Sequence, residues 1–270
     1  PPSVGAGADT HEAHEIQYTW EELSELAKLI SDNYGTEVGQ VNNDTVEVAV
    51  SINGKEDTLG IGDWTTVKIK EDDNVNEYQV RILGFNHDEL ADQTTYGGTN
   101  VYAGISFEFA ECISYTYIKT GMGTGGWKST TLRGSLNSTT FDNLENKNYI
   151  KEINKQYIAT YSNAKSVATS QDKLWLLSCS EIWNNGISSS YPYGNAVTKE
   201  GEQYKYYKDI NADSNYVNSK LIKKNNGVDE SWWLRSYVKD RDKYSVIGVD
   251  GKCATNNCFG DKGVAPGFAI

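Results

Sequence analysis

The stretch from Ser231 to Ser236, SWWLRS, places two adjacent tryptophans, a leucine and an arginine on what we expect to be one strand. Alternate side chains of a strand face opposite sides, so Trp232 and Leu234 share one face while Trp233 and Arg235 share the other. If buried, the two indole rings would fill a core. If exposed, Trp233 and Arg235 would form a stacking platform for a sugar or a peptide. The sequence favours the first arrangement, with Arg235 paired to a carboxylate near the surface.

The composition predicts one large folded domain. The chain has 270 residues, of which 38% are hydrophobic, and its 18 tyrosines and 7 tryptophans supply much of the area that a core requires. The net charge of −12 argues against nucleic-acid and anionic-membrane partners, because phosphate groups would be repelled. We also expect no transmembrane segment, since no apolar run is long enough to cross a bilayer.

The first 18 residues are rich in proline, glycine and alanine and then become polar. We expect residues 1–18 to be a flexible tail or stalk. His11 and His14 are three positions apart, whereas the helix of zinc proteases places its histidines four apart, so no metal site is predicted there. The acidic chain, rich in Asn, Ser, Thr and Tyr, is typical of a bacterial protein that is secreted or anchored at the cell surface.

Residues 19–270 are expected to form a single α+β domain, with a helix-and-hairpin portion over residues 19–58. Thr19 and Glu22 form a capping-box pattern at the start of a helix that stops near Gly35. The run TVEVAV alternates as a strand does, and Asn53-Gly54 after it predicts a hairpin turn. WTTVKIK and EYQVRIL predict a second antiparallel pair.

The second half of the chain mixes predicted helices and strands. Leu144, Ile150, Ile153 and Tyr157 recur at roughly helical spacing, which predicts a helix. DKLWLLS predicts a buried strand, and KYSVIGVDGKCATN predicts a strand followed by a turn at Asp250-Gly251.

Several landmarks occur in order: LGIGDW, ILGFNHDEL, GGWKSTTLRGSLN, QDKLWLLSCSEIW, YKYYKD, WWLRS and GVAPGFAI. This series, from Leu59 to Ile270, resembles a family of extracellular domains of unknown function that is abundant in gut Firmicutes. The ending is also similar to that of the C-type lectin-like fold. The resemblance implies a mixed, largely antiparallel sheet in which a late Trp-bearing strand precedes a Gly-Phe strand that returns beside the first strand. It places SWWLRS and GVAPGFAI in the interior of a single closed sheet.

Four aromatic or basic residues are candidates for ligand binding. Each has a purely architectural alternative, and Trp127 in its glycine-rich turn is expected to lie near Arg133, whose guanidinium should make an internal ion pair. The candidates are Trp127, Trp183, Trp233 and Arg235. Asn86, His87 and Asp88 follow a predicted strand, and because no nucleophile accompanies them a hydrogen-bonded turn is favoured over catalysis.

The stretch DINADSN alternates acidic and amide side chains, as calcium loops do, because hard oxygen ligands must converge on one cation. It departs from the EF-hand pattern, with Ser214 at the glycine position and Lys220 at the position of the bidentate glutamate. A solvated polar loop is the alternative reading. The candidate calcium ligands are Asp209, Asn211, Asp213 and Asn215.

The cysteines leave two readings open. Cys253 and Cys258 flank ATNN, which looks like a hairpin end, and they are candidates for a local disulfide. Formylglycine-generating enzymes, which share the lectin-like fold, carry two cysteines at this spacing and bind copper with them. Thiolates suit cuprous copper, but the arginine-rich surroundings of that pair are missing here. Cys112 and Cys179 are expected to be buried.

Together these observations predict a non-catalytic binding or adhesion module whose ligand is a glycan or a protein on a cell surface. The enzymatic alternative is a copper-dependent cysteine oxidase of the formylglycine-generating type. A third reading is a structural spacer domain. Apart from calcium at the DINADSN loop, no cofactor is expected.

Overall fold

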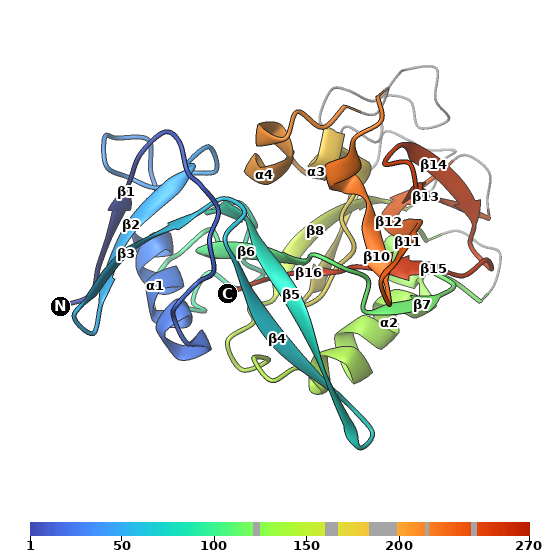
Figure 1. Cartoon of the computed structure of the whole chain (residues 1–270), viewed down its shortest axis with the longest axis horizontal. Coiled ribbons are helices and arrows are strands. Elements are labelled where there is room, and N and C mark those ends of the chain that lie inside the picture. The colour runs from blue at the N-terminus through green and yellow to red at the C-terminus, as the bar shows by residue number, and fades with distance from the viewer. Residues whose placement is uncertain (121–124, 160–166, 184–198, 214–215, 239–241) are drawn as a thin grey trace.

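We describe a computed structural model of the chain, which covers residues 1–120, 125–159, 167–183, 199–213, 216–238 and 242–270. The N-terminal part lies at one end of the molecule (Figure 1). It consists of the helix α1 (Trp20–Asp32) and a three-stranded antiparallel sheet in the order β1 (Ser3–Ala6), β2 (Glu47–Ile52), β3 (Lys55–Gly60).

Local sequence rules determine this part well. Thr19 accepts a hydrogen bond from the amide of Glu22, and the Glu22 carboxylate accepts one from the amide of Thr19, so the expected capping box is present. The apolar face of α1 is buried. Asn53 and Gly54 both have positive φ, at 53° and 75°, which is the conformation that a two-residue hairpin turn requires.

The prediction of a flexible tail over residues 1–18 is wrong. β1 pairs with β2 in antiparallel register, with Val4 opposite Val50. Further along, the amide of Ile16 donates to the carbonyl of Trp64 at 2.8 Å, and both Ile16 and Tyr18 are buried. This polar segment has few apolar residues. It still folds because its backbone groups form hydrogen bonds with the edge of β2 and with Trp64, the first residue of the strand that follows β3.

A second sheet follows in the middle of the molecule. The hairpin of β4 (Trp64–Glu71) and β5 (Asn74–Phe85) extends well beyond the body of the protein (Figure 1). Its inner half joins β6 (Ile105–Phe109) and the C-terminal strand β16 (Gly267–Ala269), giving the order β16-β6-β5-β4, all antiparallel.

The third sheet contains the tryptophan pair. Its order is β14 (Cys253–Asn257), β13 (Lys243–Ile247), β12 (Trp232–Tyr237), β15 (Lys262–Val264) and β7 (Ser114–Thr116). Trp232 and Trp233 are fully buried, as is the C-terminal Ile270. The architectural role expected for SWWLRS and for GVAPGFAI is therefore confirmed.

Their predicted place in one closed sheet is wrong. β15 pairs with β12 in parallel, but the chain then crosses at Pro266 to the second sheet, where Phe268 lies opposite Phe107. The described strands form open antiparallel sheets, apart from this one parallel pair, and no barrel. The fold is a strand-rich mixture of α and β structure.

The middle of the chain departs most from the predictions. Ile153 and Tyr157 belong to the strand β8 (Ile153–Ile158), which pairs with β9 (Val167–Asp172), so the predicted helix there is wrong. Helix runs through α2 (Thr131–Ser135) and a π-helical turn (Leu136–Thr140) and ends two residues later. The run after Asp172 is buried but contributes only a single β-bridge, at Trp175.

The remaining elements are short. They are a 3-10 turn at Trp127–Ser129, α3 (Cys179–Trp183), α4 (Lys205–Asp209), a 3-10 turn at Ser219–Leu221, and the hairpin of β10 (Lys223–Asn225) with β11 (Val228–Glu230).

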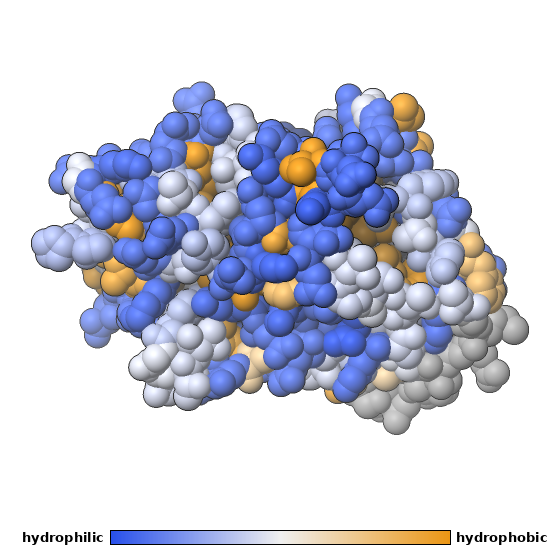
Figure 2. All heavy atoms as spheres, turned by 90° about the horizontal axis from the view of Figure 1, so that it is seen from below, coloured by the Kyte–Doolittle hydropathy of each residue, from blue (hydrophilic) through white to orange (hydrophobic). Residues whose placement is uncertain are grey.

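One hydrophobic core joins the N-terminal part to the rest. The ring of Trp20, at the start of α1, packs edge-on against Phe107 at 5.6 Å and lies 6.0 Å from Phe268. The face in Figure 2 is largely hydrophilic, with scattered apolar patches. Among the described residues no helix is both long enough and apolar enough to span a membrane.

Candidate functional site

A cleft of about 470 Å³ opens where the segment after β5 meets the β8–β9 hairpin and the start of α3. We call it the Asn86 cleft. Of the fifteen described residues that line it, only Gly201 has no polar group in its side chain. Amide, carboxylate, ammonium, hydroxyl and imidazole groups all contribute, so the cleft is built for a polar ligand.

Asn86 directly follows the last residue of β5 and lines the cleft. Its φ of 47° lies in the left-handed region, which asparagine tolerates better than most residues. Its side-chain amide nitrogen donates to the carbonyls of Ile30 and Val41, at 2.8 and 3.0 Å, so Asn86 ties distant segments together and does not cap the local turn that the sequence predicts. Its Oδ1 is buried and has no hydrogen-bond partner among the described residues. The side-chain nitrogen of Asn86 thus stabilises the fold, whereas its side-chain oxygen makes no hydrogen bond within the described residues.

His87 lies beside Asn86 in the lining. Its ring stacks on Tyr204 with centroids 4.0 Å apart, and its Nδ1 is a second buried atom without a hydrogen-bond partner among the described residues. Burial lowers the pKa of His87, and the ammonium of Lys155 adds to this effect. The imidazole is therefore neutral at neutral pH and presents one donor and one acceptor.

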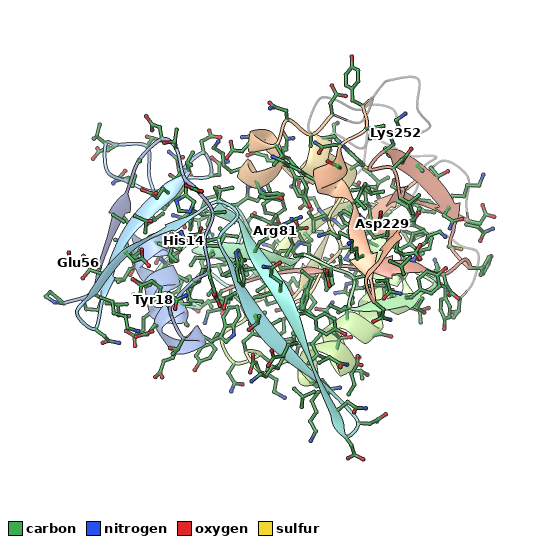
Figure 3. The ribbon with its side chains drawn as sticks, in the orientation of Figure 1. His14, Tyr18, Glu56, Arg81, Asp229 and Lys252 are labelled. Carbon is green, nitrogen blue, oxygen red and sulfur yellow. The ribbon has the colours of Figure 1, made fainter. Side chains whose placement is uncertain are left out.

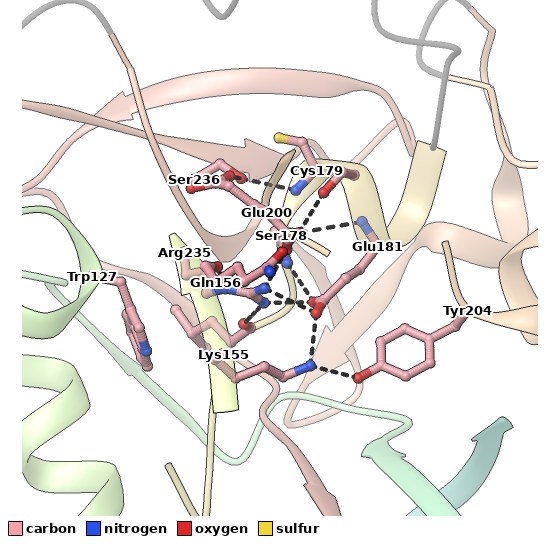
Figure 4. A network of polar contacts seen from close by, with 12 residues as sticks. Trp127, Lys155, Gln156, Ser178, Cys179, Glu181, Glu200, Tyr204, Arg235 and Ser236 are labelled. Carbon is pink, nitrogen blue, oxygen red and sulfur yellow. Dashed lines mark hydrogen bonds and ion pairs between the residues drawn. The ribbon is translucent and has the colours of Figure 1, made fainter. Parts of the chain in front are cut away.

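A set of buried charged residues, which we call the Arg235 network, shares Asp88, Lys155 and Glu181 with the lining of the cleft and continues into the interior. Figure 4 shows its part around Lys155 and Arg235. Lys155 is at its centre. The ammonium donates to Asp88 at 2.6 Å, to Glu181 at 2.7 Å and to the Tyr204 hydroxyl at 2.8 Å. Burial alone would raise the pKa of Asp88, but Lys155 and other partners hold it below its ordinary value. The network comprises Asp88, Lys155, Glu181, Glu200, Tyr204 and Arg235.

Arg235 anchors the other side of Glu181. Its Nη1 contacts Glu181 Oε2 at 2.5 Å and its Nη2 contacts Oε1 at 2.9 Å, a bidentate pair. The guanidinium also donates to the carbonyls of Gln156, Leu176 and Glu200. The expected ion pair is confirmed, although it is deep in the molecule rather than near the surface.

Glu200 is the surplus carboxylate of this network. Asp88 and Glu181 are matched by Lys155 and Arg235, so a third negative charge would have no counterpart. Burial raises the pKa of Glu200 to about 7, with Glu181 adding to the effect and Arg235 opposing it. Glu200 accepts from the amide of Ile158 at 2.9 Å and bonds to the Ser236 hydroxyl, and it does not line the cleft.

The residues predicted to bind a ligand do not face the cleft. Trp127, Trp233 and Arg235 are fully buried and Trp183 nearly so. The indole of Trp233 donates to the Thr116 carbonyl at 2.8 Å, and that of Trp127 donates to Asp172 at 2.9 Å. Their predicted role in ligand binding is wrong, because the three indole rings are packed in the interior and the Arg235 guanidinium is held by Glu181. Arg133 pairs with Asp172 at 2.5 Å, which confirms its internal ion pair.

The candidate calcium residues are distributed over a helix end and the loop after it. Asp209 is the last residue of α4 and pairs with Lys205 one turn earlier. Asn211 follows with φ of 52°, and Asn215 lies outside the described residues. The Asp209 carboxylate is thus engaged by Lys205, and calcium binding by this loop stays a prediction.

The predicted disulfide between Cys253 and Cys258 is wrong. ATNN is part of β14, with Ala254 opposite Val246 and Thr255 opposite Ser245. Cys253 begins β14 and Cys258 directly follows its last residue, so the extended run between them places their Cα atoms about 16 Å apart, well beyond what a disulfide spans. None of the four cysteines forms a disulfide. The same separation excludes one copper ion held by both thiols, and Cys253 instead contacts the thiol of Cys179.

A second cleft, of about 520 Å³, lies between the N-terminal segment and α4. We call it the Arg81 cleft. The Arg81 guanidinium sits over the Tyr206 ring at 4.3 Å and pairs with Glu108 at 2.6 Å. Lys223 pairs with the other oxygen of Glu108 at 3.2 Å, and the Tyr207 hydroxyl donates to it at 2.8 Å. We call Arg81, Glu108, Tyr207 and Lys223 the Glu108 network.

Here the surplus charge is positive, since two cations share one carboxylate. Burial lowers the pKa of Lys223 to about 8, and Arg81 acts in the same direction against the attraction of Glu108.

Comparison with known proteins assigns the second part of the chain to a family. Neither the curated proteins nor the solved structures contain a match. A family described as "Domain of unknown function (DUF6273)" matches residues 109–270, which is more than half of the chain. The match begins in β6 and ends in the C-terminal strand that pairs with it, a later start than the Leu59 suggested by the landmarks. The chain therefore belongs to the DUF6273 family of domains of unknown function.

Proposed function

We propose that this protein is a non-catalytic binding module and that the Asn86 cleft holds a saccharide. One observation carries the proposal. Asn86 Oδ1 and His87 Nδ1 are buried without partners among the described residues, and both residues line the same polar cleft. Buried polar atoms are normally hydrogen-bonded, so two unpaired atoms at one cleft call for a ligand that supplies the missing bonds.

A sugar suits these groups because each hydroxyl both donates and accepts. Amide side chains from Asn43, Asn154 and Gln156 stand in the same lining and can serve either role. Tyr34 and Tyr102 contribute rings whose centroids lie 4.8 Å apart, and such rings stack on the apolar faces of sugars. The cleft volume is that of a small-ligand site, whereas a protein partner would need a far larger contact area.

The charged floor favours binding over catalysis. Asp88 and Glu181 have lowered pKa values and are fixed by Lys155 and Arg235, so they are poor proton donors at neutral pH. Glu200, the carboxylate whose pKa is raised to about 7, is outside the lining. The carboxylates of this region are thus either held in ion pairs or outside the lining of the cleft.

The proposal extends to the fold relationship and to the place of action. The return of β16 beside β6, whose last residue begins the family match, supports the C-type lectin-like likeness. The acidic chain, rich in asparagine and tyrosine, supports a secreted or cell-surface location, as does the gut-bacterial resemblance of its landmarks.

A saccharide array probed with the whole chain, followed by calorimetry with the sugar that binds, tests the proposal. Tyr34→Ala should weaken binding about tenfold, through loss of a stacking ring. Tyr115→Ala is the matched control, because Tyr115 is similarly exposed, at 47% against 45%, but lies on β7 outside the cleft. Absence of binding up to millimolar sugar, or equal effects of the two variants, would refute it.

A further inference from the structure

The segment 11–14 is held in place by the loop that connects β3 to β4. The amide of Trp64 donates to the carbonyl of His14 at 3.0 Å, and the amide of His14 donates to Asp63 at 2.9 Å. His11 and His14 are therefore brought together by an extended chain and not by a helix, so the four-residue spacing of helical zinc sites does not apply to them. Figure 3 shows His14 between the N-terminal part and β4.

Three potential metal ligands converge at this point. His11 Nε2 lies 2.5 Å from Asp63 Oδ1, and His14 Nδ1 lies 3.3 Å from the same oxygen. One ligand atom from each of His11, His14 and Asp63 lies within 4.8 Å of the others. In a tetrahedral zinc site, neighbouring ligand atoms are roughly 3.3 Å apart. The His14–Asp63 distance already fits, and a small shift of the His11 ring would complete the set.

A second, independent observation is that His11 has a carboxylate hydrogen-bonded to its far nitrogen, and that another carboxylate lies near the far nitrogen of His14 without a direct hydrogen bond. Glu47 Oε2 lies 2.7 Å from His11 Nδ1, and Asp57 Oδ1 lies 4.0 Å from His14 Nε2. Metal-binding histidines usually have this arrangement, because the outer carboxylate fixes the ring and increases its basicity. With neutral imidazoles, three carboxylates surround the cluster and leave it negatively charged.

The His11 ring is tightly enclosed by its neighbours, whereas the His14 side of the cluster is open to solvent. His11 and Asp63 have side-chain exposures of 2% and 0%, whereas His14 is 38% exposed. A side chain at Gly60 would lie 2.2 Å from the His11 ring, so only glycine gives the ring its place. Three protein ligands with one solvent-facing position are typical of zinc sites that retain a water or bind a further group.

We propose that His11, His14 and Asp63 bind a divalent transition metal of the zinc class. Imidazole nitrogens together with one carboxylate suit zinc, cobalt or nickel, whereas calcium prefers oxygen ligands only. The bound ion would tie the N-terminal segment to the β3–β4 loop and so stabilise the part of the fold that lies before the family match. This site is separate from the Asn86 cleft and does not depend on the saccharide proposal.

The experiment uses the whole chain without an affinity tag. Cobalt(II) should produce visible absorption bands that saturate at one ion per chain, and zinc should displace it and raise the melting temperature. His14→Ala should weaken binding at least about tenfold; this residue is chosen because its exposure makes misfolding improbable. Glu12→Gln, an exposed change between the two histidines, is the matched control and should bind as the unaltered chain does.

Gly60→Ala provides a second route to the same conclusion, since the added methyl group displaces the His11 ring and should also abolish the cobalt spectrum. Absence of cobalt absorption in the unaltered chain would show that His11 and Asp63 form a hydrogen bond and no metal site. Unchanged affinity in His14→Ala, or equally tight calcium binding, would overturn the proposal as well.

Discussion

The Arg235 network and the Glu108 network both bury charges that do not balance, and the surplus charge is negative in the first and positive in the second. Each buries charged side chains beside a cleft, and each contains one charge too many. In the first the surplus is the carboxylate Glu200, whose pKa rises to about 7; in the second it is the ammonium Lys223, whose pKa falls to about 8. Removing a surplus charge should therefore cost little, whereas removing a matched one should cost much.

The largest effect is expected from Arg235→Met. Glu181 would lose its bidentate partner while remaining buried, and breaking a buried pair in this way costs about 3–5 kcal/mol. Urea denaturation followed by tryptophan fluorescence measures the loss. Arg133→Met is the control, because Arg133 is 20% exposed and water can replace part of its pairing with Asp172. Equal losses in the two variants would mean that burial of the network has no special cost.

Glu108→Gln should be the next most damaging change. It leaves Arg81 and Lys223 facing each other without a counter-charge, at a cost of roughly 2–3 kcal/mol, reduced because Arg81 reaches solvent in part. Adding Lys223→Met to this variant should recover part of the loss. A double-mutant cycle in urea quantifies the coupling, and strictly additive effects would contradict a shared charge balance.

Glu200→Gln tests the surplus carboxylate through pH. The folded pKa of about 7 lies above the ordinary value of 4.5, so the folded state binds the extra proton. The stability that neutral Glu200 contributes is complete below pH 4.5 and is lost as the pH rises through 7. Between pH 5 and pH 8 the unaltered chain should lose on the order of 2 kcal/mol relative to the glutamine variant. Parallel pH profiles would contradict the raised pKa.

Lys223→Met tests the surplus cation, with the opposite sign and a smaller effect. The folded pKa of about 8 lies below the ordinary 10.5, so the unfolded state binds more protons between these values. Stability is fully present above 10.5 and is lost as the pH falls through 8. From pH 8 to pH 9.5 the unaltered chain should gain on the order of 1 kcal/mol over the methionine variant. A gain of the same size in both chains would exclude Lys223 as its source.

The accuracy of the sequence-based predictions follows the range of the interactions involved. α1 and the first two hairpins were predictable because capping at Thr19 and the turn at Asn53-Gly54 act within a few residues. β8 was predicted as a helix because Ile153 and Tyr157 also fit helical spacing. Its pairing with β9 prevailed over that local signal.

The site was only half visible for the same reason. Asn86, His87 and Asp88 stood out after a strand, but the partners that give them meaning are distant in sequence. Lys155 is 67 positions from Asp88, and Arg235 is 54 positions from Glu181. The spacing rule misses the histidine pair near the N-terminus because it describes helices, and the carboxylates around the pair are supplied by β2, β3 and the loop after β3. Long-range placement of this kind cannot be deduced from spacing alone.

The pairing of β1 with β2 has a practical meaning for shortening this protein. The sequence suggests that the folded part begins at Thr19. A chain that started there would lack β1 and would expose the unpaired backbone groups at the edge of β2. Such an edge recruits other strands, so the shortened protein would be inclined to aggregate. The first residues of the chain thus protect the edge of this sheet from pairing with other molecules.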